Sequence, residues 1–304
     1  MPGLPMADDT LEFRSGFVAL VGRSNVGKST LLNRLIGQKI AITSAKPQTT
    51  RNRILGIVTR PDGQILFLDT PGLHRARSPL NRQMVAQAHE ACRSVDLILW
   101  LVEADRSVDA EPLVAAALAQ SRAPVVLVVN KIDLVGPEQL LPLLAAYSRL
   151  REFAAIVPVS ALRGEGVESL LSVVLEQLPP GPRYYPDDQV TDLPERFIVA
   201  ELIREQLLAL THDEIPHGAA VQVESFTEDE ERGLVVISAV IHVERETHKR
   251  MVIGKGGAMI RRLGQEARRE IEALLACRVY LELFVRVQPG WTSSGRALRE
   301  FGYS

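Results

Sequence analysis

The fold of this chain is decided by the stretch Phe17-Val18-Ala19-Leu20-Val21-Gly22-Arg23-Ser24-Asn25-Val26-Gly27-Lys28-Ser29. Its apolar start predicts a buried strand, and the residues that follow match G-x-x-x-x-G-K-[ST] between a strand and a helix. Gly22 and Gly27 let the backbone curl so that its N–H groups face phosphate oxygens, beside the positive end of the next helix. The Lys28 ammonium can then reach the β- and γ-phosphates, and the Ser29 hydroxyl can bind Mg²⁺. The stretch therefore predicts a nucleotide-binding site.

Short apolar runs alternate with longer segments of helical period up to about residue 178. They predict strands at residues 17–21, 53–59, 64–68, 97–102, 125–129 and 155–159. The turn Pro61-Asp62-Gly63 predicts that the second and third strands form an antiparallel hairpin. The expected first domain is α/β, with a mostly parallel sheet and helices on both faces.

A break follows at residues 179–186, which hold four prolines and a glycine and cannot continue a helix. Beyond it the pattern predicts a helix, two strands, a helix-loop-helix and a last strand, at residues 195–210, 221–226, 234–243, around 254–257, and 279–287. This helix-strand-strand-helix-helix-strand order is typical of an α+β domain. We therefore divide the chain into an N-terminal extension (1–15), a nucleotide-binding domain (16–178), a linker (179–194) and a second domain with its C-terminal tail (195–304).

Composition limits the class of protein. With 304 residues, 46% of them hydrophobic and 24% charged, the chain has the composition of a two-domain globular protein. A net charge of −2 excludes a wholly basic nucleic-acid binder but not a local basic patch. Cys92 and Cys277 do not suffice for a disulfide framework or a cysteine zinc site, which predicts a reducing compartment, the cytoplasm. The N-terminus has no signal-peptide pattern, and no apolar run approaches the roughly 20 residues of a membrane span.

Three further motifs each follow a predicted strand. Asp69-Thr70-Pro71-Gly72 places a carboxylate where it can hold Mg²⁺ through water, while the Gly72 N–H meets a γ-phosphate. In Asn130-Lys131-Ile132-Asp133, the Asp133 carboxylate can accept hydrogen bonds from the N1–H and 2-amino groups, which guanine has and adenine lacks. Asn130 is expected to hold the purine and the loop, and the Lys131 stem to pack on the ring. In Ser160-Ala161-Leu162, the Ala161 N–H is expected to meet the guanine O6.

The predicted nucleotide is therefore GTP or its product GDP. The predicted contacts come from Gly22, Arg23, Ser24, Asn25, Val26, Gly27, Lys28, Ser29, Thr30, Asp69, Thr70, Pro71, Gly72, Leu73, Asn130, Lys131, Asp133, Ser160, Ala161 and Leu162.

The second domain carries Val252-Ile253-Gly254-Lys255-Gly256-Gly257-Ala258-Met259-Ile260, which reads V-I-G-x-x-G-x-x-I, the signature of a KH domain. Such a loop between two helices lets backbone N–H groups and a lysine clamp about four single-stranded nucleotides, beside an apolar groove for bases. Seven basic residues and one acidic residue lie between Lys249 and Arg269, as expected for phosphate binding. RNA contacts are predicted for Ile253, Gly254, Lys255, Gly256, Gly257, Ile260, Arg261 and Arg262.

Together these motifs resemble the Era family, bacterial GTPases of small-subunit ribosome assembly. The segments Ile40-Ala41-Ile42-Thr43-Ser44 and Pro47-Gln48-Thr49-Thr50-Arg51-Asn52-Arg53 look like the family's first switch region, and the resemblance runs from about Gly16 to Tyr303. It implies that Thr49 or Thr50 closes over Mg²⁺ and the γ-phosphate. We favour Thr50, because related threonine-threonine-arginine switches use the second threonine. The metal set is then Ser29, Thr50 and Asp69, and the catalytic set is Lys28, Thr50, Asp69, Gly72 and Asn25.

Many GTPases place a glutamine directly after this Asp-x-x-Gly motif to orient the attacking water, but here the residue is Leu73. Leucine cannot orient water, so we expect slow, Mg²⁺-dependent hydrolysis by the chain alone. Asn25 occupies the position that helps to bind a monovalent cation in related potassium-stimulated GTPases, which makes K⁺ a candidate cofactor. His74, next to Leu73, is a second candidate for assisting hydrolysis. The alternative is that His74 is simply exposed to solvent.

The resemblance implies a GTP-hydrolysing switch that binds 16S rRNA near its 3′ end and assists assembly of the 30S ribosomal subunit. It also implies peripheral association with the inner face of the cell membrane, and we expect a monomer. Two alternatives stay open: a nucleotide-gated RNA-binding module in which hydrolysis is incidental, and a tRNA-modification GTPase. The latter needs an added catalytic domain or a reactive C-terminal cysteine, whereas Cys277 reads as a small core residue. The aromatic tail, Trp291–Ser304, either stacks on RNA or packs on its own domain.

Overall fold

The apolar strands of the first half associate into one six-stranded sheet. The structure is a computed structural model, and it describes residues 12–44, 46, 49–73, 79–108, 112–211, 215–216 and 218–303. The strands are β1 (Arg14–Val21), β2 (Ile54–Arg60), β3 (Gly63–Asp69), β4 (Leu97–Glu103), β5 (Val125–Asn130) and β6 (Ala155–Pro158). Their order is β2-β3-β1-β4-β5-β6, with β2 antiparallel to β3 and the other pairs parallel. The hairpin predicted from the turn at residues 61–63 is thus present.

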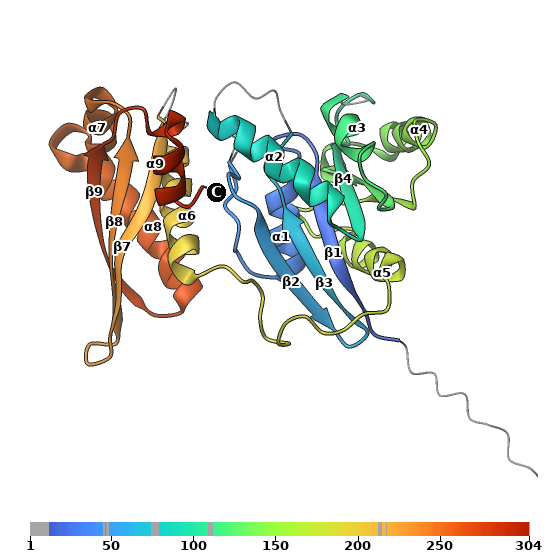
Figure 1. The fold of residues 1–304 in the computed structure, drawn as a ribbon, viewed down its shortest axis with the longest axis horizontal. Coiled ribbons are helices and arrows are strands. Elements are labelled where there is room, and N and C mark those ends of the chain that lie inside the picture. The colour runs from blue at the N-terminus through green and yellow to red at the C-terminus, as the bar shows by residue number, and fades with distance from the viewer. Residues whose placement is uncertain are drawn as a thin grey trace, which may run out of the picture.

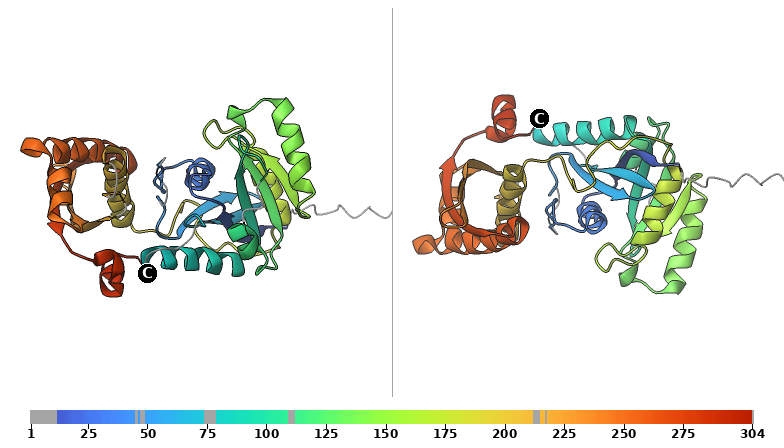
Figure 2. Two further views of the ribbon diagram at one scale, coloured as in Figure 1. Left: turned by 90° about the horizontal axis from the view of Figure 1, so that it is seen from above. Right: turned by 90° about the horizontal axis from the view of Figure 1, so that it is seen from below.

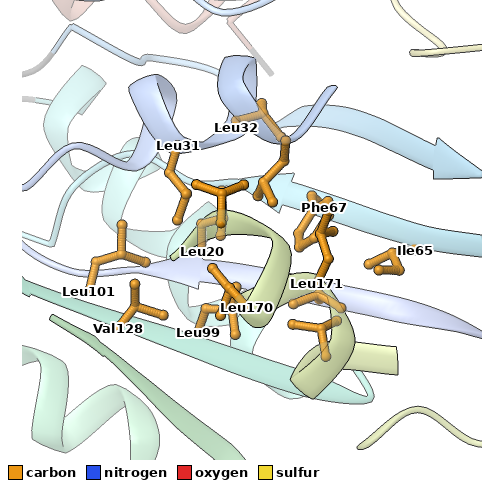
Figure 3. Packing of buried hydrophobic residues seen from close by; sticks show 14 of the residues in the cluster. Leu20, Leu31, Leu32, Ile65, Phe67, Leu99, Leu101, Val128, Leu170 and Leu171 are labelled. Carbon is orange, nitrogen blue, oxygen red and sulfur yellow. The ribbon is translucent and has the colours of Figure 1, made fainter. Parts of the chain in front are cut away.

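Helices cover both faces of this sheet because its strands are apolar on both sides. The helices are α1 (Lys28–Ile36), α2 (Pro79–Arg93), α3 (Pro112–Leu118), α4 (Pro137–Ser148) and α5 (Val167–Gln177), with a 3₁₀ turn η1 (Ile132–Leu134). Leu20 faces α1 and α5, where it meets the leucines drawn in Figure 3, while Ala19 faces α2, α3 and α4. The predicted α/β architecture is confirmed.

The second half forms a smaller α+β unit, which runs from yellow through orange to red in Figure 1. Its elements are α6 (Glu195–Leu210), β7 (Ala219–Asp229), β8 (Leu234–Val243), α7 (Glu246–Ile253), the turn η2 (Lys255–Gly257), α8 (Ala258–Leu275) and β9 (Arg278–Val287). Strand β8 pairs antiparallel with β7 and parallel with β9, and the apolar sides of α6 and α8 pack on one face of this sheet. The element order is the one predicted for a KH domain.

The proline-rich segment between the two units lies along the edge of the first sheet (Figure 1). The buried Gln64 side chain accepts hydrogen bonds from the N–H groups of Tyr184 (2.8 Å) and Tyr185 (3.0 Å), and donates to the Tyr185 carbonyl (2.9 Å). Further along, the Ile57 N–H donates to the Val190 carbonyl (2.8 Å). This segment is therefore a strap on the first domain rather than a free tether.

The tail continues through η3 (Trp291–Ser293) and α9 (Gly295–Glu300). The prediction offered RNA stacking or packing on its own domain, but the tail also packs on the first domain. Trp291, Phe301 and Tyr303 are buried in one cluster with Leu80 and Met84 of α2. Burial in this cluster removes these aromatic faces from solvent, so they offer no surface for stacking RNA.

Leu170 of α5 is fully buried against the sheet, so Leu170→Ala should lower the free energy of unfolding of the first domain by about 2–5 kcal/mol. Urea denaturation followed by the fluorescence of Trp100, in a Trp291→Phe background, measures it. The matched control is Leu141→Ala on α4, where the side chain is 67% exposed and the expected change is within about 0.5 kcal/mol. Equal changes for the two variants would contradict this account of the core.

Candidate functional site

The loop that joins β1 to α1 folds as a phosphate-binding loop because two of its residues adopt left-handed backbone conformations. Asn25 has φ +66° and Gly27 has φ +102°, and a Cβ at Gly27 would lie 2.2 Å from Nδ2 of Asn130. Only glycine fits there. The Lys28 ammonium lies inside the loop and donates to the carbonyls of Gly22 (3.2 Å) and Arg23 (2.9 Å). The loop thus holds a cation at the place where the sequence predicted phosphates.

Three oxygen-bearing side chains converge beside this loop. The Ser29 hydroxyl donates to Oδ2 of Asp69 (2.6 Å), and Oγ1 of Thr50 lies 2.9 Å from Oγ of Ser29 and 3.3 Å from Asp69 Oδ2. Oγ1 of Thr49 instead donates to the Lys46 carbonyl (2.7 Å), away from the other two. Of the two candidate threonines, it is Thr50 that the fold brings to Ser29 and Asp69.

This corner fits Mg²⁺, which prefers oxygen ligands. Asp69 is fully buried, and its Oδ1 has no hydrogen-bond partner among the described residues. Burial raises the pKa of the Asp69 carboxyl, against the opposing effects of Lys28, Ser29 and Thr50. A buried carboxylate with an unused oxygen is poorly satisfied by the protein alone, and a hydrated cation would satisfy it.

The motif after β3 is fastened to the phosphate loop. The Thr70 hydroxyl donates to the Leu20 carbonyl (2.8 Å), and a Cβ on Gly72 would lie within 2.9 Å of Ser24 atoms. The Leu73 N–H donates to the Gly22 carbonyl (3.3 Å), and the Leu73 side chain is buried in the core under α2. Leu73 is thus a core residue without a polar group to orient water, whereas His74 lies outside the described residues.

The predicted guanine-reading residues also come together. Asn130 Nδ2 donates to the Val26 carbonyl (2.8 Å), which locks the third motif to the phosphate loop. The Ser160 hydroxyl donates to Oδ1 of Asp133 (2.6 Å) and orients this carboxylate. The Ala161 N–H, expected to face the guanine O6, here donates to Oδ1 of Asn130 (3.0 Å). Its contact with guanine stays a prediction that requires this N–H to be shared or released.

Two residues of this site, Glu103 and Arg34, are not predicted by the sequence motifs. Glu103 ends β4, and its nearly buried carboxylate pairs with the Lys131 ammonium and with Nε of Arg106 (2.7 Å), which orients the lysine stem. Arg34 of α1 donates to the carbonyls of Ala161 (3.2 Å) and Leu162. An acidic residue at the carboxyl end of a strand was a usable signal for Glu103, whereas only the fold brings Arg34 to residues 161–162.

The second candidate site is a groove between α8 and β9. The glycine loop at residues 254–257 opens onto it, Lys255 is exposed, and the lining is Gly257, Ile260, Arg261, Gly264, Gln265, Arg268, Tyr280, Leu281 and Leu283. Arg262 is exposed but is not part of this lining, and Ile253 is only half-buried behind the loop. The β9 contributions were missed, although the exposed Tyr280 in an alternating strand was a visible signal.

Ion pairs neutralise part of the positive charge between Lys249 and Arg269. Arg269 pairs with Glu266 (3.1 Å), and Arg268 lies 3.8 Å from Glu272, an acidic residue just beyond the counted window. Among the described residues, the positive side chains that form no ion pair include Lys255 in the glycine loop and Arg261 in the groove lining.

Asp133→Asn should lower the affinity for GTP by about 100-fold or more, because the amide cannot accept both guanine hydrogen bonds and repels one of the donors. Affinity for xanthosine triphosphate should rise, because the new NH₂ group can donate to the xanthine O2. Fluorescence titration with labelled GTP and with its xanthine analogue measures both. Unchanged preference for guanine would show that Asp133 does not read the base.

Comparison with known proteins indicates the family of each half of the chain. Residues 17–131 match the family model described as 50S ribosome-binding GTPase, and residues 214–292 match the KH domain model. The chain is 59% identical over 293 residues to GTPase Era of Geotalea uraniireducens (96% of this chain, 98% of the relative) and 51% identical over 296 residues to GTPase Era of Syntrophus aciditrophicus (97% of each).

Solved structures of Era also share the fold of this chain. A crystal structure of Era in complex with MgGDPNP and nucleotides 1506–1542 of 16S ribosomal RNA superposes with a TM-score of 0.92 at 39% identity, covering 96% of this chain and 99% of that one. Era of Aquifex aeolicus bound to GDP·AlF₄⁻ gives the same TM-score and the same coverage at 38% identity. The order of the motifs, the two family models and the near full-length identity lead to one conclusion: this chain belongs to the Era family of GTPases.

Proposed function

We propose that this protein is a GTP-binding and GTP-hydrolysing switch that binds 16S rRNA near its 3′ end and assists assembly of the 30S ribosomal subunit. The observation that carries the proposal is the convergence of Ser29, Thr50 and Asp69 in a chain that also holds a KH groove. The family's complex with MgGDPNP and a 16S rRNA fragment supports both halves, because its fold matches over nearly the whole chain.

Roles for the site residues follow from their positions. Lys28 and the loop N–H groups hold the β- and γ-phosphates, while Ser29, Thr50 and Asp69 hold Mg²⁺ directly or through water. Bound there, Mg²⁺ neutralises charge on the phosphate oxygens. Gly72 lines a cavity beside the phosphate loop together with Ser24, Asn25 and Thr50, and its N–H would donate to the γ-phosphate. Asp133 reads the guanine edge, and Asn130 ties this reading to the phosphate loop.

Hydrolysis is proposed to be slow in the isolated chain, because Leu73 is packed in the core and no side chain replaces the water-orienting glutamine at that position. Asn25 has a left-handed backbone (φ +66°) and lines the cavity beside the phosphate loop, so its amide oxygen can serve there as a ligand. We propose that this oxygen helps to bind K⁺, whose positive charge stabilises the transition state.

The finer assignments of place and assembly rest on the family resemblance. We propose a cytoplasmic monomer that contacts the inner face of the cell membrane peripherally. Among the residues that the structure describes, every helix is too short or too polar to cross a bilayer.

A nucleotide-gated RNA-binding module with incidental hydrolysis is the competing function, since the KH groove alone would serve it. The two differ in whether the ribosomal subunit accelerates the chemical step. If hydrolysis is part of the switch, single-turnover GTP cleavage should be at least about tenfold faster with 30S subunits than without them, as expected when a missing stabilising group is supplied in trans.

The matched variant for this assay is Lys255→Asp, which reverses the charge of the exposed loop cation without touching the nucleotide site. It should abolish the stimulation by 30S subunits and leave the rate of the free protein unchanged. Rapid-quench measurement of radiolabelled phosphate release gives both rates. No stimulation of the wild type at saturating subunits would favour the binding-module function.

The K⁺ proposal predicts that the wild-type protein hydrolyses GTP at least about tenfold faster in KCl than in NaCl of equal ionic strength. Asn25→Ala should bring the two rates together at the lower value, whereas Arg296→Ala, an exposed change on α9, should keep the difference. Steady-state phosphate release in the two salts is the measurement. Equal wild-type rates would remove K⁺ from the list of cofactors.

A further inference from the structure

Arg51, the residue after Thr50, sends its side chain out of its own domain. The guanidinium is completely buried, and it donates from Nη1 to the carbonyl of Ala219 (2.7 Å) and from Nη2 to that of Pro216 (2.9 Å). Nη1 also lies 3.3 Å from the Tyr303 hydroxyl. The partners of this arginine thus include the start of β7 and the end of the chain.

Two aromatic rings of the tail enclose the same guanidinium. Its central carbon lies 5.9 Å from the ring centre of Trp291 and 5.5 Å from that of Tyr303. The two rings stack with centroids 5.8 Å apart, and Nε1 of Trp291 donates to the Gly218 carbonyl (3.0 Å). An arginine held by two rings and by directed hydrogen bonds has little freedom to move.

Thr49, on the other side of Thr50, is also held by the KH domain. Its carbonyl accepts a hydrogen bond from Nη2 of Arg204 on α6. Arg204 is itself fixed by Glu201 through two contacts of 2.7 and 2.6 Å, and both are buried. Both neighbours of Thr50 are therefore anchored by residues that lie more than 150 positions further along the chain.

The tail is in turn attached to the first domain. Gln83 of α2 donates to the Tyr303 carbonyl (3.0 Å), and Asn52 donates to the Gly302 carbonyl (3.0 Å). Figure 2 shows, from both sides, that the C-terminus ends against the tip of α2 between the two domains. The end of the chain thus bridges the first switch segment and α2.

We propose that Tyr303 and Trp291 are positioning residues that act through Arg51 to set Thr50 at the metal corner. The contacts on both sides of Thr50 restrict its backbone before the ligand binds. Less conformational entropy is then lost when Mg²⁺ and GTP bind at Oγ1. The last residues of the chain thereby complete a site nearly 250 positions earlier. The inference rests on the metal-binding role of Thr50 proposed above.

The test compares the affinities for GDPNP and GDP in excess Mg²⁺, because only GDPNP carries the γ-phosphate over which Thr50 closes. Arg51→Ala and Tyr303→Ala should weaken GDPNP by about tenfold, since each removes a buried contact of a charged group, and leave GDP within about twofold. Tyr303→Phe keeps the ring and should weaken GDPNP binding less than Tyr303→Ala does. It replaces Tyr303→Ala if that variant does not fold. Arg296→Ala, exposed on α9, is the control for the tail.

A double variant separates positioning from general loosening. If Arg51 acts through Thr50, Thr50→Ala combined with Arg51→Ala should bind GDPNP no more weakly than Thr50→Ala alone. Additive losses, or equal losses for GDP and GDPNP, would overturn the inference. If Thr50→Ala itself leaves the ratio of the two affinities unchanged, the proposed metal role of Thr50 fails, and the inference fails with it.

Discussion

The parallel pairing of β1 with β3 on one side and β4 on the other is the constraint on which the nucleotide site depends. Parallel strands end at the same edge of a sheet, so the phosphate loop after β1 and Asp69 at the end of β3 become neighbours. The continued parallel register through β5 and β6 brings Asn130 and Ser160 to that edge as well. Motifs that are more than 130 residues apart in the chain, such as Ser29 and Ser160, thus share one site.

Within this edge, short hydrogen bonds connect one motif to the next. Asn130 holds the carbonyl of Val26 and accepts from Ala161, so the guanine-reading loops and the phosphate loop cannot move independently. Ser29 and Thr50 meet Asp69 in a corner where burial disfavours an unpaired carboxylate. The buried Asp69 oxygen that has no hydrogen-bond partner among the described residues is therefore one that a bound cation would satisfy.

The two domains are joined by more than the strap of residues 179–194. Lys39 pairs with Glu205 of α6 (2.6 Å) and with Glu270 of α8 (2.9 Å), the helix that also lines the KH groove. Arg51 and Arg204 are buried in the same joint, where Arg51 contacts the start of β7 and Tyr303, and Arg204 contacts Glu201 and the Thr49 carbonyl. The first switch segment and the residues that precede it therefore contact α6, α8 and the tail directly.

The sequence by itself determined the element order, the α/β and KH folds, and the identity of the motif residues, because periodicity and glycine-rich loops are local properties. It also identified Thr49 and Thr50 as alternatives. The family resemblance favoured Thr50, but only the tertiary structure shows the contacts that separate the two: Oγ1 of Thr50 lies beside Asp69, whereas Oγ1 of Thr49 donates to the Lys46 carbonyl. The same holds for Glu103, Arg34 and Tyr280, and for the tail on α2, whose roles arise from contacts between distant segments. No local pattern encodes such contacts, because they exist only once packing brings the segments together.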